Sequence, residues 1–173
     1  IFKAAISDAT EYASDIAALK GKSVEEVITK LTTDDVRSAC DLFAGIYRSS
    51  NGIDGRVSIE VDPRSAHDTS ATVNEGKSLW QIIDRPNVLI KVPATLAGLP
   101  AITELIGAGI SVNVTLIFSI ERYVQVIEAY IAGIELAAKN GLDLTQIHSV
   151  ASFFISRLDT AIDPILKADG GVL

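Results

Sequence analysis

The chain has 173 residues, the usual size of one domain. Its 48% hydrophobic and 21% charged residues are typical of a globular protein and exclude a disordered or fibrous one. The 15 basic and 22 acidic residues give a net charge of −7, which argues against a nucleic-acid partner and against an acidic membrane surface.

Cys40 is the only cysteine, so an internal disulfide and a cysteine-based zinc site are both excluded. No apolar run reaches the roughly 18 residues that a membrane span needs, and the N-terminus lacks a signal-peptide pattern. We therefore expect a cytoplasmic protein.

Two helices are predicted in the first third of the chain. Ser23-Val-Glu-Glu26 has the pattern of a capping box and predicts a helix to about Leu31. Thr33-Asp34-Asp35 predicts the start of a second helix, which Asn51-Gly52 ends. Cys40 falls at helical spacing with apolar neighbours, so we expect a small core residue rather than a reactive thiol.

Strands and helices are predicted to alternate over the rest of the chain. The strands are residues 57–62, 87–92, 110–116 and 147–153. The clearest helix covers residues 119–140, with an apolar face of the kind that packs on a core: Ile120, Tyr123, Val124, Ile127, Ile131, Ile134 and Ala138. This order predicts βαβ units, a parallel sheet and a single α/β domain over residues 1–173.

Polar residues inside the strands favour a barrel over an open doubly wound sheet. They are Ser58, Glu60 and Asp62 on one face of the first strand, Lys91 in the second, Asn113 and Thr115 in the third and Ser152 in the fourth. Helices on both faces of a doubly wound sheet would bury these groups without partners. In a TIM (β/α)8 barrel such groups converge on one open mouth. We therefore predict a partial TIM barrel with about four parallel strands.

Several common motifs are incomplete. Gly76-Lys77-Ser78 resembles the end of a P-loop, but the earlier glycine is replaced by Ala71. The only histidines, His67 and His148, form no metal-binding pair. We expect His67 in a solvated loop, with a peripheral role in a site as the alternative, and His148 as a structural residue.

Lys91 is the most informative residue. It interrupts the apolar strand Val88-Leu-Ile-Lys-Val-Pro93, so we expect its side chain to be largely withdrawn from water. Such surroundings disfavour the ammonium form and leave an amine able to attack a carbonyl. Glu60 of the preceding strand is the candidate acid/base. A purely structural Lys91–Glu60 ion pair is the alternative.

Four segments resemble, in order and spacing, strand motifs of the transaldolases, which are Schiff-base class I aldolases. They are Val57-Ser-Ile-Glu-Val-Asp-Pro63, Asn87-Val-Leu-Ile-Lys-Val-Pro-Ala-Thr95, Ser111-Val-Asn-Val-Thr-Leu-Ile-Phe-Ser119 and Ser152-Phe-Phe-Ile-Ser-Arg157. The segment from Pro63 to Asp68 is similar to that of actinobacterial members, and Ile1-Phe2-Lys3 resembles the segment after the family's second strand.

The resemblance implies a role for each candidate residue. Lys91 would form the Schiff base, Glu60 would act as acid/base and Thr115 would help to position the catalytic water. Asn113 and Ser152 would bind substrate hydroxyls, Phe154 would line the pocket and Arg157 would hold the phosphate, as a guanidinium fork suits phosphate oxygens. On the residues alone, a surface cation on the following helix is the preferred interpretation of Arg157, and phosphate binding is the alternative.

The implied reaction transfers a dihydroxyacetone unit from sedoheptulose 7-phosphate to glyceraldehyde 3-phosphate, a step of the pentose phosphate pathway. It requires phosphorylated sugars but no metal and no organic cofactor. One alternative is a fructose-6-phosphate aldolase; members of that kind typically carry Gln and Tyr where this chain has Glu60 and Phe154. A non-catalytic sugar-phosphate-binding protein is the alternative from another class.

The resemblance also implies that the chain supplies strands three to six of the barrel. A complete (β/α)8 barrel has eight strands and about 250 residues. Two further strands are therefore expected before Ile1 and two after Leu173. The first of them should carry an aspartate that cooperates in carbon–carbon cleavage. The sequence makes no prediction of the oligomeric state.

Overall fold

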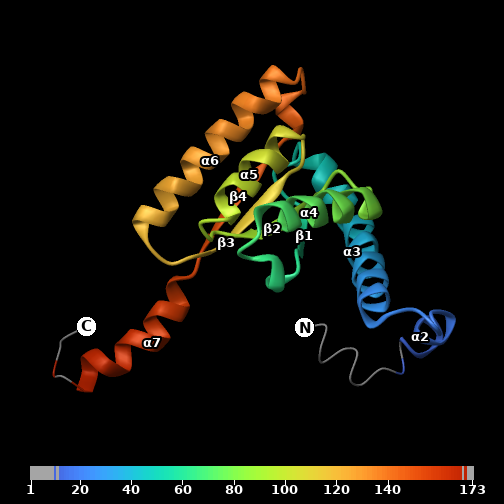
Figure 1. Cartoon of the computed structure of the whole chain (residues 1–173), viewed down its shortest axis with the longest axis horizontal. Helices are drawn as coiled ribbons and strands as arrows, with labels where there is room; N and C mark the ends of the chain where they lie inside the picture. The colour runs from blue at the N-terminus through green and yellow to red at the C-terminus, as the bar shows by residue number, and fades with distance from the viewer. Residues whose placement is uncertain (1–9, 11, 169, 171–173) are drawn as a thin grey trace. The chain divides into compact units, whose positions relative to one another are not determined.

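The structure is a computed structural model that describes residues 10, 12–168 and 170 (Figure 1). Its elements are α2 (Ala13–Ala18), α3 (Val24–Ser49), β1 (Val57–Glu60), η1 (Pro63–Ser65), α4 (Thr69–Ile83), β2 (Val88–Pro93), α5 (Gly98–Gly107), β3 (Val112–Ile117), α6 (Ile120–Lys139), η2 (Leu144–Gln146), β4 (Ser149–Phe153) and α7 (Ile155–Ala168). The segment Ile1-Phe2-Lys3 lies outside the described residues. Contacts group the chain into two compact units, residues 1–57 with 81–88 and residues 58–80 with 89–173. The prediction of a single domain stays a prediction.

Helix α3 dominates the first unit. Its capping box is confirmed, because the Ser23 side chain accepts from the Glu26 N–H while the Glu26 carboxylate accepts from the Ser23 N–H. The predicted break near Thr33 is wrong, since one helix runs through that position. Thr33 is buried and its hydroxyl donates to the carbonyl of Thr29, so the residue satisfies its polar group without ending the helix.

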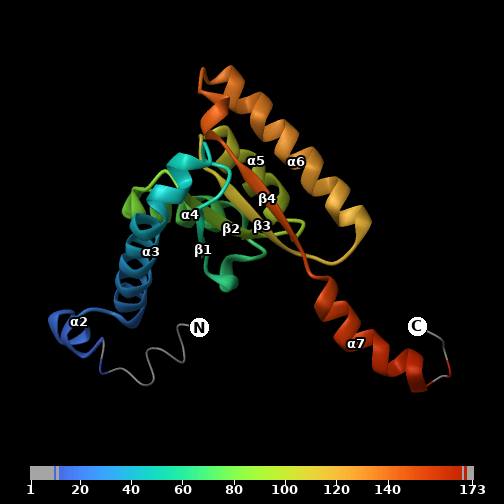
Figure 2. The ribbon, with the colours of Figure 1, turned by 180° about the vertical axis from the view of Figure 1, so that it is seen from behind.

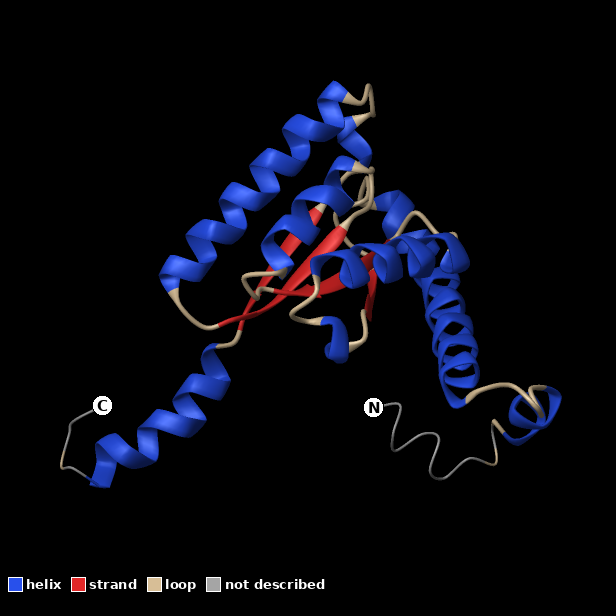
Figure 3. Cartoon of the chain, viewed as in Figure 1, coloured by secondary structure: helices blue, strands red, loops and turns tan. Residues whose placement is uncertain are grey.

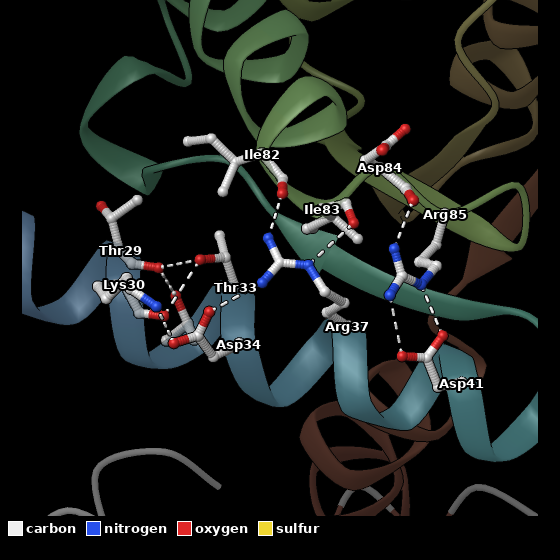
Figure 4. A network of polar contacts seen from close by, with 11 residues as sticks. Thr29, Lys30, Thr33, Asp34, Arg37, Asp41, Ile82, Ile83, Asp84 and Arg85 are labelled. Atoms are coloured by element: carbon white, nitrogen blue, oxygen red, sulfur yellow. Dashed lines mark hydrogen bonds and ion pairs between the residues drawn. The ribbon is translucent and has the colours of Figure 1, made fainter. Parts of the chain in front are cut away.

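Two arginines tie α3 to the segment after α4 within this unit (Figure 4). Arg37 donates to the carbonyls of Ile82 and Ile83, which the end of α4 leaves without helical partners. Arg85 forms a two-pronged ion pair with Asp41, at 2.6 and 3.0 Å. This hydrogen-bonded pair lowers the pKa of the Asp41 carboxyl below its ordinary value.

The core of the first unit includes Cys40, as predicted. Cys40 is fully buried, and burial raises the pKa of its thiol to about 11. The Asn87 side-chain amide is also buried and donates to the carbonyls of Cys40 and Gly55, at 2.9 and 2.8 Å. Asn87 thereby satisfies two backbone acceptors that water does not reach.

The second unit contains nearly all of a four-stranded sheet in the order β1-β2-β3-β4, alternating with helices (Figure 3). The strands are parallel, with Ile90 beside Val112 and Asn113 beside Val150. Strands that follow one another in both sequence and space are the arrangement of a TIM barrel, whereas a doubly wound sheet reverses its order at a switch point. The structure therefore has the arrangement of a partial TIM barrel, and the prediction is confirmed.

Helices cover one face of this sheet. Figures 1 and 2 show α4 and α5 on the same side of β2 and β3. The core there consists of fully buried aliphatic residues, among them Ile90, Val92, Ile102, Leu105, Val112 and Val114. Gly76 packs in this layer, since a Cβ on it would lie 3.0 Å from the Leu105 methyl groups. Gly76-Lys77-Ser78 is therefore part of helix α4 and not a phosphate loop.

Helix α6 packs on α5 through a different face from the one expected. The predicted apolar face is largely exposed, with Ile120 72% and Ile131 51% accessible. Its buried residues are instead the small ones, Val126, Ala129, Gly133 and Ala137. Gly133 lets α5 approach closely, because a Cβ there would lie only 2.7 Å from Cβ of Ile106.

The two histidines lie where the sequence analysis placed them. His67 is exposed in the loop before α4, where Asp68 accepts from the N–H of Ala71 and caps that helix. His148 is partly buried, and its N–H donates to the Ser111 hydroxyl. Among the described residues, no helix combines the length and hydrophobicity that crossing a membrane requires.

Candidate active site

Polar side chains gather on the face of the sheet opposite α4 and α5. Ile90 faces the helices, because its Cγ2 would lie 3.5 Å from a Cβ on Gly76 of α4. Its neighbour Lys91 therefore faces the other side. The strand register sets Asn113 beside Lys91 and Thr115 beside Pro93, on that same side.

Lys91 and Glu60 form an ion pair on this face. The Lys91 Nζ donates to Glu60 Oε2 at 3.2 Å. Full withdrawal of Lys91 from water is not observed, since its side chain is 29% exposed and that of Glu60 49% exposed. The strand around Lys91 is buried as predicted, but the long side chain extends from it to a face that the described helices leave open.

Asn113 connects three strands. Its Nδ2 donates to Ser58 Oγ of β1 at 3.1 Å, and its Oδ1 accepts from Ser152 Oγ of β4 at 2.8 Å. Strand β2 lies between β1 and β3, so in a flat sheet Ser58 and Asn113 would stand roughly 9.6 Å apart, twice the ordinary strand spacing. The hydrogen bond requires the sheet to curl toward this face, as the wall of a barrel does.

Thr115 carries an unsatisfied hydroxyl. Its side chain is buried, and its Oγ1 is among the few buried polar atoms of the described residues that have no hydrogen-bond partner. A buried hydroxyl without a partner is costly unless a water molecule or a ligand completes it. Thr115, which pairs with Pro93 two residues after Lys91, therefore offers a hydrogen bond to a water molecule or another small polar ligand.

Phe154 and Arg157 meet just after β4. The guanidinium carbon of Arg157 lies 4.6 Å from the centre of the Phe154 ring, a cation–π contact. Arg157 is exposed in the first turn of α7, so its donors are accessible to an anion. A planar guanidinium suits phosphate oxygens.

Asp62 does not join this group, although it was expected on the polar face of the first strand. Strand β1 ends at Glu60, and Asp62 instead caps η1 by accepting from the N–H of Arg64. Hydrogen bonds from Arg64 lower the pKa of the Asp62 carboxyl. Among the described residues, no cluster of three or more His, Cys, Asp or Glu side chains has the arrangement of a metal site.

Sequence reasoning did not anticipate two contacts at this site, the hydrogen bond of Ser58 and the ring stacking of Phe118. Ser58 was placed on the polar face, but its bond to Asn113 needs the curvature of the sheet, which no local pattern reveals. Phe118 stacks on Phe154 with ring centres 5.7 Å apart. Phe118 follows β3 beyond the positions where strand alternation could be applied.

The fold and the site define an α/β protein with consecutive parallel strands and a lysine–carboxylate pair on the open face of its sheet. The family model "Transaldolase/Fructose-6-phosphate aldolase" matches residues 1–171. The chain is 59% identical to "Transaldolase 1" of Streptomyces coelicolor over 172 residues, which are 98% of this chain and 45% of that protein. It is 58% identical to "Transaldolase" of Mycolicibacterium smegmatis over 98% of this chain and 46% of that protein.

The chain belongs to the transaldolase/fructose-6-phosphate aldolase family. It spans about half the length of the curated relatives that it matches, including the 46% that it covers of "Transaldolase" from Mycolicibacterium paratuberculosis. The resemblance inferred from the four strand motifs is thereby confirmed.

Proposed function

We propose that the protein is a transaldolase that acts on phosphorylated sugars through a Schiff base on Lys91. It transfers a dihydroxyacetone unit from sedoheptulose 7-phosphate to glyceraldehyde 3-phosphate, in the pentose phosphate pathway of the cytoplasm. The observation that carries the proposal is the ion pair of Lys91 with Glu60, 3.2 Å apart, on the open face of a buried strand. The names and the identity of the relatives support it.

The reaction begins at the Lys91 amine. Once deprotonated, the Nζ attacks the ketose carbonyl carbon to form a carbinolamine, which loses water and becomes a protonated imine. Glu60 is within hydrogen-bond reach of Nζ and so can carry the protons that these steps move. A base then takes the proton of the C4 hydroxyl, the C3–C4 bond breaks, its electron pair moves toward the imine, and C4 leaves as the aldehyde product. The resulting enamine attacks the carbonyl carbon of the acceptor aldehyde, whose oxygen takes up a proton, and the imine forms again. Water adds to the imine carbon, the C–N bond breaks, and the new ketose and the Lys91 amine are released.

The surrounding residues would orient the sugar. Thr115, with its unsatisfied buried hydroxyl, would hold the water that imine formation releases and imine hydrolysis consumes. Asn113 and Ser152 would exchange the hydrogen bond between them for hydrogen bonds to substrate hydroxyls. Phe154 would line the pocket, and Arg157 would bind the phosphate.

Borohydride trapping tests the proposal. The protein that carries this chain is incubated with fructose 6-phosphate and borohydride, and the labelled residue is mapped by mass spectrometry. We expect a covalent adduct on Lys91, its loss in Lys91→Arg and its retention in Lys77→Arg, a control at an exposed lysine of α4. An adduct elsewhere, or none with active protein, rejects the assignment.

The Glu60→Gln variant separates catalysis from a structural ion pair. We expect turnover to fall by about 10²–10⁴-fold with the fold intact, because an amide cannot shuttle protons. If the variant unfolds while its folded fraction keeps wild-type turnover, the Lys91–Glu60 ion pair is structural and Glu60 is not the acid/base. A non-catalytic sugar-phosphate-binding protein would instead show neither turnover nor a borohydride adduct.

A fructose-6-phosphate aldolase is the second candidate, because the matching family model names both activities. It would release free dihydroxyacetone from fructose 6-phosphate alone. A transaldolase instead requires an acceptor such as erythrose 4-phosphate. Comparing the two assays on one preparation distinguishes them, and Glu60 and Phe154 favour the transferase on the resemblance described above.

A further inference from the structure

Three side chains form a stack at the end of the sheet that carries the candidate site. The Phe118 and Phe154 rings lie 5.7 Å apart with an angle of 29° between their planes. The Arg157 guanidinium lies 4.6 Å from the centre of the Phe154 ring. Phe154 therefore links Phe118, at the end of β3, to a cation in the first turn of α7.

A β-bulge in β3 brings the two rings together. Up to Val114 the strands pair regularly, with Val114 beside Ala151, but then Ile117 pairs with Phe153. A regular ladder would set Ile117 beside Phe154, and Phe118 would then lie one residue beyond Phe154 instead of opposite it. The extra residue in β3 instead brings Phe118 opposite Phe154, whose N–H donates to the Ile117 carbonyl at 3.0 Å.

The bulge has a conformational cost. Leu116 adopts φ of +59°, a left-handed conformation that is unfavourable for residues with a Cβ. Leu116 is itself 38% exposed, so its own burial compensates this cost only in part. The contacts made beyond the bulge, including the stack of Phe118 on Phe154, are the gain that the altered register brings.

We propose that Phe118 is a positioning residue for the phosphate end of the substrate, which it serves by holding Phe154 under the Arg157 guanidinium. This inference rests on the proposed function, in which Arg157 binds the phosphate. An unsupported Phe154 ring has more freedom to turn, and Arg157, exposed on its helix, then loses its preferred orientation. The effect should fall on binding of phosphorylated substrates and not on the chemistry at Lys91.

The test compares KM and kcat of Phe118→Leu with fructose 6-phosphate and with fructose as donor. We expect KM for fructose 6-phosphate to rise about two- to fivefold, the size of an exposed cation–π contact, with kcat unchanged and fructose kinetics unaffected. Phe118→Tyr keeps the ring and should restore the wild-type KM. Phe153→Leu is the matched control, since Phe153 is the neighbouring residue but contacts Tyr123 instead of the stack.

Arg157→Ala separates this inference from the proposed function. We expect it to raise KM for fructose 6-phosphate by about 10–100-fold and to spare fructose, because charge-assisted bonds to phosphate are lost. Equal effects on both donors would overturn the phosphate role of Arg157 and the inference with it. If Arg157→Ala is selective but Phe118→Leu changes both donors alike, or neither, only the inference is overturned. If Phe118→Leu and Phe118→Ile both fail to fold while Phe153→Leu folds, Phe118 is a structural residue and the inference is again overturned.

Discussion

Replacing Asn113 by alanine should destabilise the protein by removing the link between β1, β3 and β4. The substitution deletes the donor to Ser58 at 3.1 Å and the acceptor for Ser152 at 2.8 Å. A neutral hydrogen bond contributes about 0.5–1.5 kcal/mol net, so two bonds predict a loss of about 1–3 kcal/mol. Ser58 and Ser152 are only half-buried, so water can replace Asn113, and the loss should lie in the lower half of that range.

Urea denaturation measures this loss directly. The single tryptophan, Trp80 on α4, gives a fluorescence signal for the unfolding of the same unit. Ser58→Ala and Ser152→Ala each remove one of the two bonds. Their individual losses should add up to that of Asn113→Ala within about 0.5 kcal/mol if the bonds act independently.

One outcome would refute the reasoning. If Ser58→Ala is neutral while Asn113→Ala is costly, the bond across β2 does not form and the sheet is not curled as inferred. A large change in the denaturant slope would instead mean that the variant alters the surface exposed on unfolding.

The remaining predictions concern the loop after β2 and the buried thiol. Gly98→Ala should destabilise by about 1–3 kcal/mol and lower kcat, because its Cβ would lie 2.1 Å from the Pro93 carbonyl oxygen, two residues after the candidate lysine. Gly45 lies at an exposed helical position where an added Cβ would have no atom within 4 Å, so Gly45→Ala should instead stabilise the protein by about 0.5–1 kcal/mol. If denaturation shows the same loss of stability for both variants, the steric argument is contradicted. Cys40 should resist thiol reagents at pH 8 until the protein unfolds, as followed by the release of a chromophoric disulfide reagent. Burial raises the pKa of the Cys40 thiol to about 11, whereas an unfolded thiol titrates near 8.5. The stability that the protonated thiol contributes should therefore be complete below about pH 8.5 and lost as the pH rises through 11. A Cys40→Ala variant that lacks this loss of stability at alkaline pH would confirm that Cys40 causes it.

Local patterns predicted the sheet better than the helices. Alternation placed Ser58 and Glu60 on one face of β1, and the polar interruption of β2 identified Lys91, because period-two patterns depend only on each strand's own residues. The helix break at Thr33 was wrong because a threonine can satisfy its hydroxyl on the preceding turn as readily as it can cap.

The packing face of α6 shows a second kind of limit. Hydrophobicity alone indicated the face of Ile127 and Ile131, yet the buried stripe contains Ala129 and Gly133. Close packing of two helices rewards small side chains, which let the backbones approach and let Ile106 fill the space. A hydrophobicity pattern gives the greatest weight to large apolar side chains. It therefore indicates the wrong packing face for a helix whose neighbour lies close to its backbone.

The candidate site depended on both kinds of information. The chemistry of Lys91 and Glu60 could be inferred from residue types, since few structural reasons place an amine in an apolar strand. Their 3.2 Å contact also needs the two strands to be neighbours in the right register, and the pairing of Phe118 with Phe154 needs an extra residue that no alternation anticipates. The strained backbone of Leu116 is the physical trace of that extra residue. Because such strain persists only where surrounding contacts hold it, the contacts at this end of the sheet, near Arg157, must outweigh the cost of the Leu116 conformation.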